Sequence, residues 1–228
     1  MLKFIVTMIT ISKEDYLKEI YALSLFTDEP VSTSKIAEKL NITNAATSDM
    51  AKKLSALDLL SYEKYKGVKL TEKGRTIALN TIRRHRLWET FLIKTLGLNW
   101  GEVHDEAEVL EHQTSEFLMD RIDQFLNFPE FDPHGDPIPT KEGLMPVLPE
   151  VVCLTEAEIG KTYIIQKVDH DNKEVMDYFT KLGIELYSEI ALEDRMKFDN
   201  SVFVSINNIR HTFSQQVASK LFVVNKNI

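Results

Sequence analysis

Apolar residues recur with a helical period through most of the first 128 positions of the chain. From 13 to 26 they return every three or four residues, which predicts an amphipathic helix. Two shorter helices are predicted at 34–40 and 45–57, with a tight turn between them. The run LLSYEKYKGVKL at 59–70 is rich in aromatic and β-branched residues around a glycine and predicts a two-stranded hairpin. This order of elements is typical of a winged helix-turn-helix.

A long amphipathic helix is predicted after Thr71, ending near Gly97, and two more helices are predicted at 102–118 and 120–128. A proline-rich stretch follows. From position 151 the pattern changes to the short β-rich runs YIIQKV, SEIAL, SVFVSI and KLFVV, with one helical insert at 174–182. The predicted fold is therefore mainly α with small β parts. The expected domains are a winged helix-turn-helix at 1–74, a helical domain at 75–140, a linker at 141–150 and a small β-barrel at 151–228.

Composition narrows the class of protein. The chain has 228 residues, of which 43% are hydrophobic and 27% charged, and this excludes collagen-like and disordered proteins. The apolar opening stretch 1–11 is too short to span a bilayer and precedes no small-residue cleavage site. A single cysteine, Cys153, excludes an internal disulfide and a thiolate metal cluster. We expect a cytoplasmic protein without a membrane segment.

Charge is distributed unevenly along the chain, whose net charge is −8. Residues 1–100 carry 16 basic against 11 acidic side chains, whereas residues 101–150 carry 2 against 13. A mildly basic first part beside a strongly acidic middle indicates a polyanion-binding module joined to a region that attracts cations. Two solvated faces without any ligand are the alternative.

The second helix of the predicted helix-turn-helix is the candidate for the DNA major groove. Its first turns offer hydroxyl, amide and methyl groups but no arginine, which favours modest base readout. Lysines later in this helix and in the hairpin can contact phosphates. The candidate DNA contacts are Thr43, Asn44, Ala45, Ala46, Ser48, Asp49, Lys52, Lys53, Lys64, Tyr65 and Lys66. A helical hairpin that binds another protein is the alternative.

Histidines and carboxylates are spaced for a metal site. His104, Glu108, Glu111 and His112 fall on one helix face, at i, i+4, i+7 and i+8. Two further candidate ligands, His85 and Glu89, form an i, i+4 pair, and Asp15 lies on the first helix. Oxygen and imidazole donors without thiolate suit Mn²⁺ or Fe²⁺ ahead of zinc. An acidic surface face is the alternative reading.

These motifs resemble the diphtheria-toxin-repressor family of metal-dependent transcriptional repressors, and within it the manganese transport regulators. The resemblance covers about the first 140 residues. It rests on KEDYLKEIYAL at 13–23, VSTSKIAEKLNI at 31–42, EKYKGVKLTEKG at 63–74, RRHRLWETFL at 83–92, VHDEAEVLEH at 103–112 and PHGDPIP at 133–139. The C-terminal segment is similar to the SH3-like, iron-transport-accessory-type domain that many members append.

The resemblance implies two metal sites. The regulatory site is Asp15, Glu108, Glu111 and His112, and the second site is His85, Glu89 and His104, with Asp169 of the C-terminal domain as a further ligand. His170 and Asp171 are rivals to Asp169. Iron-responsive members have methionine and cysteine where this chain has Asp15 and Glu108, so the resemblance favours manganese, with ferrous iron as the alternative. Lys18 stands where some two-domain manganese regulators have an acidic residue, which favours two separate sites.

The resemblance also implies a homodimer, formed through the region after His104, that binds an inverted-repeat DNA operator and represses genes for metal uptake. Two other functions are weighed against this one. A metalloenzyme could use Glu111 as a base, but it leaves the winged module unexplained. A winged-helix sensor of an organic ligand would leave the acidic face inert. We expect a repressor that is not an enzyme and binds no small organic ligand.

Overall fold

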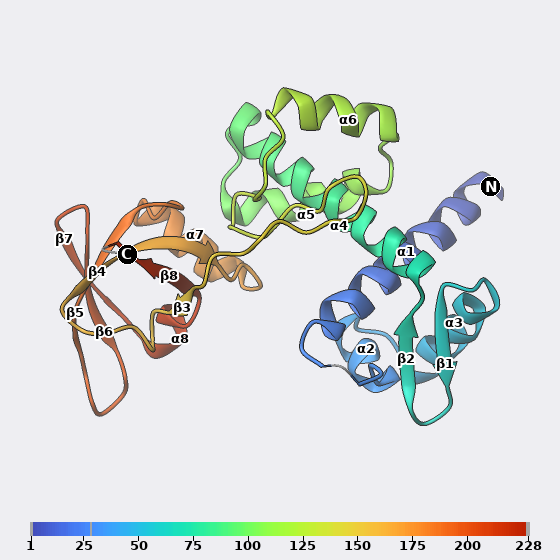
Figure 1. The fold of residues 1–228 in the computed structure, drawn as a ribbon, viewed down its shortest axis with the longest axis horizontal. Coiled ribbons are helices and arrows are strands. Elements are labelled where there is room, and N and C mark those ends of the chain that lie inside the picture. Colours follow the sequence, from blue (N-terminus) through green and yellow to red (C-terminus); the bar gives the residue numbers. More distant parts are fainter. Residues whose placement is uncertain (1, 28, 227–228) are drawn as a thin grey trace. The chain divides into compact units, whose positions relative to one another are not determined.

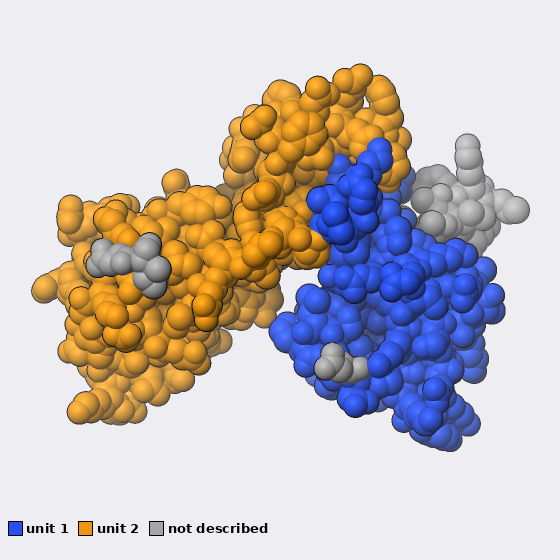
Figure 2. Space-filling model, viewed as in Figure 1, with its two compact units in different colours: residues 1–85, 111–114, 139–144 blue, residues 86–110, 115–138, 145–228 orange. Residues whose placement is uncertain are grey.

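The computed structural model describes residues 2–27 and 29–226, and for residues 2–12 it describes the helical backbone. The chain divides into two compact units that are interleaved in sequence (Figure 2). The first unit comprises residues 1–85, 111–114 and 139–144, and the second comprises residues 86–110, 115–138 and 145–228.

The first unit contains a helix-turn-helix and a β-hairpin (Figure 1). The two predicted short helices are confirmed, each starting one residue earlier than predicted. Ser32 and Thr43 cap them, since Ser32 Oγ accepts a hydrogen bond from Lys35 N and Thr43 Oγ1 accepts one from Ala46 N. The elements of this unit are α1 (Leu2–Ser24), α2 (Thr33–Lys39), α3 (Asn44–Ala56), β1 (Leu60–Glu63), β2 (Gly67–Leu70) and the first part of α4 (Glu72–Phe91).

Helix α1 is longer than predicted. It begins at Leu2 rather than at Lys13. The sequence before Lys13 is mostly apolar, so it lacks the alternation of apolar and polar residues on which the prediction relied. Among the described residues, no helix combines the length and the apolar character that a bilayer-spanning segment needs.

A buried core joins α1 to the helix-turn-helix and the hairpin. The core residues include Tyr16, Leu17, Ile20, Ile36, Leu54 and Val68. The Tyr16 hydroxyl donates a hydrogen bond of 3.0 Å to the carbonyl of Thr47, so α1 is attached directly to α3. Val31 and Val68 exchange two backbone hydrogen bonds of 2.9 Å, which attach the segment before α2 to β2. Position 67 must be glycine here, because its φ is +115° and a Cβ would lie 2.5 Å from the Val31 carbonyl oxygen.

The hairpin is confirmed as a wing. Strands β1 and β2 are antiparallel, with Leu60 opposite Leu70 and Glu63 opposite Gly67. The turn between them contains Tyr65, which is 93% exposed and has a φ of 70°.

The second unit begins with helices. Helix α4 continues into a π-helical turn that ends at Gly97, whose φ is 72°. The helix predicted over 102–118 was wrong: the chain leaves the helix after Glu111, and Ser115 caps a new one by accepting a hydrogen bond from Leu118 N. The helix predicted over 120–128 therefore begins and ends earlier. After α4, the helical elements of this unit are η1 (Leu92–Leu96), α5 (Trp100–Glu111) and α6 (Glu116–Phe125). The buried core of this helical part includes Leu87, Trp88, Val103, Ala107, Met119, Ile122 and Ile138.

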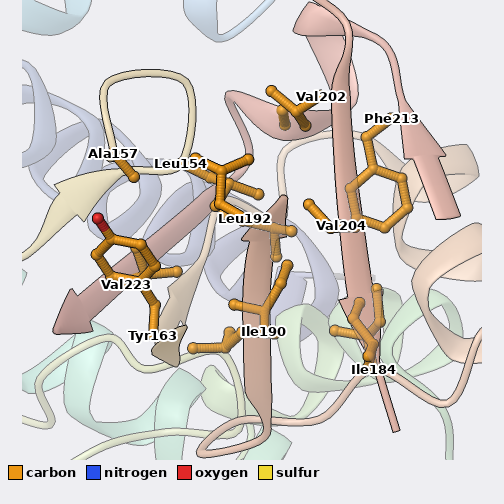
Figure 3. Packing of buried hydrophobic residues seen from close by; sticks show 14 of the residues in the cluster. Leu154, Ala157, Tyr163, Ile184, Ile190, Leu192, Val202, Val204, Phe213 and Val223 are labelled. Atoms are coloured by element: carbon orange, nitrogen blue, oxygen red, sulfur yellow. The ribbon is translucent and has the colours of Figure 1, made fainter. Parts of the chain in front are cut away.

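The C-terminal part of the second unit is a six-stranded antiparallel sheet with the order β3-β8-β4-β5-β6-β7. Its hydrophobic core includes Ile190, Leu192 and Val204 from the sheet (Figure 3). Met176 and Phe179 from α7 belong to the same core. The four predicted β-rich runs are strands, but β3, β7 and α8 were not predicted. The elements are β3 (Val152–Cys153), β4 (Lys161–Val168), α7 (Lys173–Lys181), β5 (Glu189–Arg195), β6 (Val202–Ile206), β7 (Ile209–Phe213), α8 (Gln215–Ala218) and β8 (Leu221–Asn225). The predicted fold class, helical with a small C-terminal β domain, is confirmed.

Candidate metal centre

Two carboxylates and a histidine from distant parts of the sequence meet in the first unit. Asp15 lies on α1, Glu111 is the last residue of α5, and His112 follows it. His112 Nε2 is 2.9 Å from Asp15 Oδ1 and 3.3 Å from Glu111 Oε1. The structure thus brings together three of the four residues predicted for the regulatory site. The fourth, Glu108, stands one turn earlier on α5, at i−4 from His112.

This donor set fits a divalent cation. Asp15, Glu111 and His112 each offer one donor atom within 4.8 Å of the others. Asp15 Oδ1 is buried and faces the Nε2 atom of His112, so one cation could bind both donor atoms. The cation would take the place of the proton on Nε2. Two carboxylate oxygens and one imidazole nitrogen suit Mn²⁺ or Fe²⁺.

The orientation of His112 depends on a carboxylate that the sequence did not reveal. His112 Nδ1 is 2.6 Å from Glu14 Oε2, and Glu14 Oε1 is in turn 3.1 Å from Arg84 Nη2 on α4. Glu14 thus accepts a hydrogen bond from Nδ1–H of His112, and Nε2 of the same ring faces Asp15 and Glu111. A carboxylate behind a ligating imidazole commonly fixes the tautomer and the ring orientation of that ligand.

The same carboxylates stabilise a proton on His112. Burial alone would lower the pKa of this ring, but the carboxylates of Asp15, Glu14 and Glu111 outweigh burial and raise the pKa to about 9. The ring is therefore protonated at neutral pH. A metal ion binding to Nε2 has to displace that proton.

Glu111 is completely buried and contacts Lys18 and His85. Its Oε1 is 2.8 Å from Lys18 Nζ, and its Oε2 is 2.5 Å from His85 Nδ1. His85 was predicted to belong to the second metal site. The structure places its ring against Glu111, a residue predicted for the regulatory site.

A second cluster lies in the other unit, around the buried side chain of Glu89. Glu89 Oε1 is 3.5 Å from His104 Nδ1, as the predicted pairing of these residues requires. Glu89 Oε2 faces a different histidine, His134, whose Nδ1 is 3.7 Å away. Glu89 also groups with Asp132 and His134 at metal-ligand spacing, and all three side chains are buried. The sequence analysis did not single out Asp132 or His134 as ligands, although Asp132 immediately precedes the quoted PHGDPIP motif and His134 lies within it.

The loop that presents His134 is tightly built. Asp132 Oδ1 accepts backbone hydrogen bonds from His134 (2.8 Å) and Asp136 (2.9 Å), and Asp136 forms an ion pair of 2.7 Å with Lys167 on β4. Burial, followed by the charges of Asp136 and Glu89, raises the pKa of Asp132 to about 6. Both ring nitrogens of His134 are buried, and Nδ1 faces Glu89 Oε2. A buried imidazole beside carboxylates fits a metal ligand.

The C-terminal domain places His170, which the sequence analysis names as a rival to Asp169, beside this cluster. Asp169 forms an ion pair of 2.9 Å with Lys220, and its pKa is lowered because that pairing outweighs burial. The neighbouring His170 stacks on His134 with ring centroids 4.3 Å apart, and it groups with Glu89 and His104 at metal-ligand spacing. Burial and the nearby His134 lower the pKa of His170 to about 4, so this ring is neutral and able to ligate.

The candidate DNA contacts lie on the surface of the first unit. All are exposed except Ser48, which is half-buried. Thr43 uses its hydroxyl as the cap of α3, and Lys52 pairs with Asp49 at 3.1 Å. On the wing, Lys66 pairs with Glu63 at 2.6 Å. Both lysine pairs are solvent-exposed and therefore weak, which leaves these ammonium groups available to phosphates.

Comparison with protein families accounts for nearly the whole chain. Residues 8–68 match the iron dependent repressor N-terminal DNA binding domain, residues 71–140 match the iron dependent repressor metal binding and dimerisation domain, and residues 152–225 match the FeoA domain.

Individual relatives agree with these matches. A solved structure described as a manganese-dependent transcriptional repressor in complex with manganese superposes with a TM-score of 0.83 and 38% identity, over 93% of this chain and 99% of the other. The regulator MntR of Listeria innocua is 34% identical over 63% of this chain and 98% of its own length. The iron-dependent repressor IdeR of Mycobacterium tuberculosis is 38% identical over 55% of this chain, and the match spans 54% of IdeR. The chain belongs to the diphtheria-toxin-repressor family of metal-dependent transcriptional repressors.

Proposed function

We propose that this chain is a manganese-dependent repressor that acts in the cytoplasm, binds an inverted-repeat operator as a homodimer and controls genes for metal uptake. The observation that carries the proposal is the cluster of Asp15, Glu111 and His112 in the first unit, whose oxygen and nitrogen donors lie at metal-ligand spacing. Glu108, one turn earlier on α5, is the proposed fourth ligand. The known relatives named above include manganese- and iron-dependent repressors.

The geometry suggests how the site could act on DNA binding. Asp15 adjoins Tyr16, and Tyr16 holds α3 through its hydrogen bond to the Thr47 carbonyl. A bound cation would link α1 to the end of α5 through Asp15, Glu111 and His112. Restraining α1 at Asp15 therefore restrains the helix that carries the candidate base contacts. An ion that binds more tightly to the DNA-competent arrangement shifts the population toward it, by no more than that difference in affinity.

Manganese is favoured by the ligand types. Asp15 and Glu108 supply hard oxygen donors, and no sulfur donor stands at either position. Ferrous iron is the alternative, because it accepts the same donors with higher intrinsic affinity.

For the second site we propose two groups of ligands around Glu89. One group is Glu89 with Asp132 and His134. The other is His104 with His170, beside the second oxygen of Glu89. His85 and Asp169, which the sequence also suggested, contact Glu111 and Lys220 in the chain without metal, and their part in this site stays a prediction. The C-terminal domain would then take part in this second site through an imidazole.

A dimer interface is proposed on α6. Phe117, Leu118 and Phe125 are exposed on this helix, with Phe117 71% and Phe125 67% accessible. Exposed apolar residues on one short amphipathic helix are typical of a surface that a second copy covers. Two-fold symmetry of the protein would match an inverted-repeat operator.

The function is tested by fluorescence anisotropy of the metal-stripped chain on DNA from its own upstream region, titrated without oxygen with Mn²⁺, Fe²⁺ and Zn²⁺. Tighter DNA binding at micromolar Mn²⁺ is the expected result. A response to Fe²⁺ alone would replace manganese by iron, and DNA binding that ignores all three metals would refute the proposal.

Replacing Glu14 by alanine is expected to weaken Mn²⁺ binding by about 10- to 100-fold, because His112 loses the carboxylate that orients its ring. Glu14→Gln should have a smaller effect, since the amide oxygen still accepts the Nδ1 hydrogen bond. Isothermal titration with Mn²⁺ measures both. The matched control is Glu63→Gln, which alters an exposed ion pair on the wing of the same unit. Equal Mn²⁺ affinity in Glu14→Ala and the native chain would show that Glu14 does not position His112.

A further inference from the structure

Lys18 lies one turn after Asp15 on α1, and its ammonium group contacts Glu111 of the proposed regulatory site. Lys18 Nζ is 2.8 Å from Glu111 Oε1, and only 14% of the lysine side chain is exposed. The contact is therefore between a nearly buried ammonium and a completely buried carboxylate, which makes it stronger than a surface ion pair.

The oxygen that Lys18 contacts is also the one that faces the other candidate ligands. Glu111 Oε1 is 3.3 Å from His112 Nε2, whereas Glu111 Oε2 is directed to His85. Through Oε1 the carboxylate can serve either the ammonium group of Lys18 or a metal ion held with His112 and Asp15. Sharing the oxygen would bring a divalent ion and an ammonium group within a few ångström, where their charges repel strongly in a buried setting.

We propose that Lys18 is an intramolecular competitor for Glu111 and that it sets the metal concentration at which the regulatory site fills. This inference rests on the proposed function of that site. Lys18 neutralises Glu111 when no ion is bound and has to withdraw from Oε1 when an ion binds. The cost of that withdrawal lowers the metal affinity, so the site responds to an excess of metal rather than to traces.

Competition and simple structural support predict opposite results for removal of the charge. A lysine that only supports the fold would, when replaced, lower stability and metal affinity together. A competitor would, when replaced, lower the stability of the metal-stripped chain, because Glu111 loses a counterion, but raise its metal affinity.

The experiment uses the full chain with Lys18→Met and Lys18→Gln, stripped of metal, with Mn²⁺ affinity measured by titration calorimetry and stability by thermal unfolding. Lys18→Gln keeps a hydrogen-bond donor without the charge, and so provides a folded variant if Lys18→Met unfolds. Both variants are expected to bind Mn²⁺ about tenfold more tightly and to melt at a lower temperature without metal. Lys18→Arg, which retains the charge, should stay close to the native affinity.

The matched control is Lys161→Met, which removes an ammonium paired with Glu158 at 2.7 Å on the surface of the C-terminal domain. It should leave Mn²⁺ affinity unchanged. Unchanged or weaker Mn²⁺ binding in both Lys18→Met and Lys18→Gln would overturn the inference, even if DNA binding of the native chain responds to metal. Tighter Mn²⁺ binding in these variants supports it, even if DNA binding proves independent of metal, in which case the proposed function alone fails.

Discussion

Replacing His112 by alanine will remove the activation of DNA binding by Mn²⁺. The imidazole offers the one nitrogen donor of the proposed regulatory site, and it lies between the carboxylates of Asp15, Glu111 and Glu14. Without the ring, three acidic groups face a cavity, and the cation loses a ligand and the geometry that ligand fixes. Mn²⁺ affinity is expected to fall by more than about 100-fold, beyond the loss typical for an outer partner of a ligand.

The measurement is Mn²⁺-titrated anisotropy on operator DNA, with His211→Ala as the control. His211 lies on β7 of the second unit and contacts Phe213 with ring centroids 6.2 Å apart. His211→Ala should respond to Mn²⁺ as the native chain does. If His112→Ala also responds at native Mn²⁺ concentrations, the ion that activates DNA binding is bound elsewhere.

His112 also gives the metal-stripped chain a characteristic pH dependence. Its folded-state pKa of about 9 lies above the ordinary value of 6.5, so its contribution to stability is complete below pH 6.5 and is lost as the pH rises to 9. In thermal unfolding without metal, the melting temperature of the native chain should therefore decrease over this range more steeply than that of His112→Ala.

Replacing Lys64 and Lys66 together by alanine will weaken binding to all DNA sequences and flatten the salt dependence of that binding. Both lysines are exposed on the wing, and Lys66 is held only by a solvent-exposed pair with Glu63. Each phosphate contact that is lost reduces the slope of log affinity against log salt by about 0.9. With two wings in a dimer, affinity should fall by about tenfold or more at physiological salt.

The control for the wing variant is Lys181→Ala with Lys197→Ala, which removes the same charge from the C-terminal domain. Its DNA affinity and salt slope should match those of the native chain. Anisotropy on operator and on unrelated DNA separates the two roles that the wing could have. A loss confined to operator DNA would show that these lysines read bases rather than contact phosphates.

Local signals in the sequence were sufficient to predict most of the helices and strands. Amphipathic periods and cap residues such as Ser32 and Thr43 predicted the helix-turn-helix, since these effects act within a few residues. The break after Glu111 was missed because apolar residues keep a helical spacing across Ser115, whose capping hydroxyl is decisive.

The candidate metal centre was predictable only in part. Donors close together in the sequence, such as Glu108 and His112, can be recognised from their spacing. Glu14 and Lys18 do not, because their roles arise when α1 meets the end of α5, and many surface helices carry such charges. The contact of Asp169 with Lys220, 51 residues away in sequence, likewise arises only in the fold.

Metal at the regulatory site and DNA on the helix-turn-helix are expected to stabilise the same arrangement of the chain. Coupling of this kind is reciprocal. The most direct test is therefore the Mn²⁺ affinity of the native chain measured twice, once free and once saturated with operator DNA. DNA is expected to tighten Mn²⁺ binding by the same factor by which Mn²⁺ tightens DNA binding, and His112→Ala is expected to show neither effect. Equal Mn²⁺ affinity with and without operator DNA would show that the two sites are not coupled.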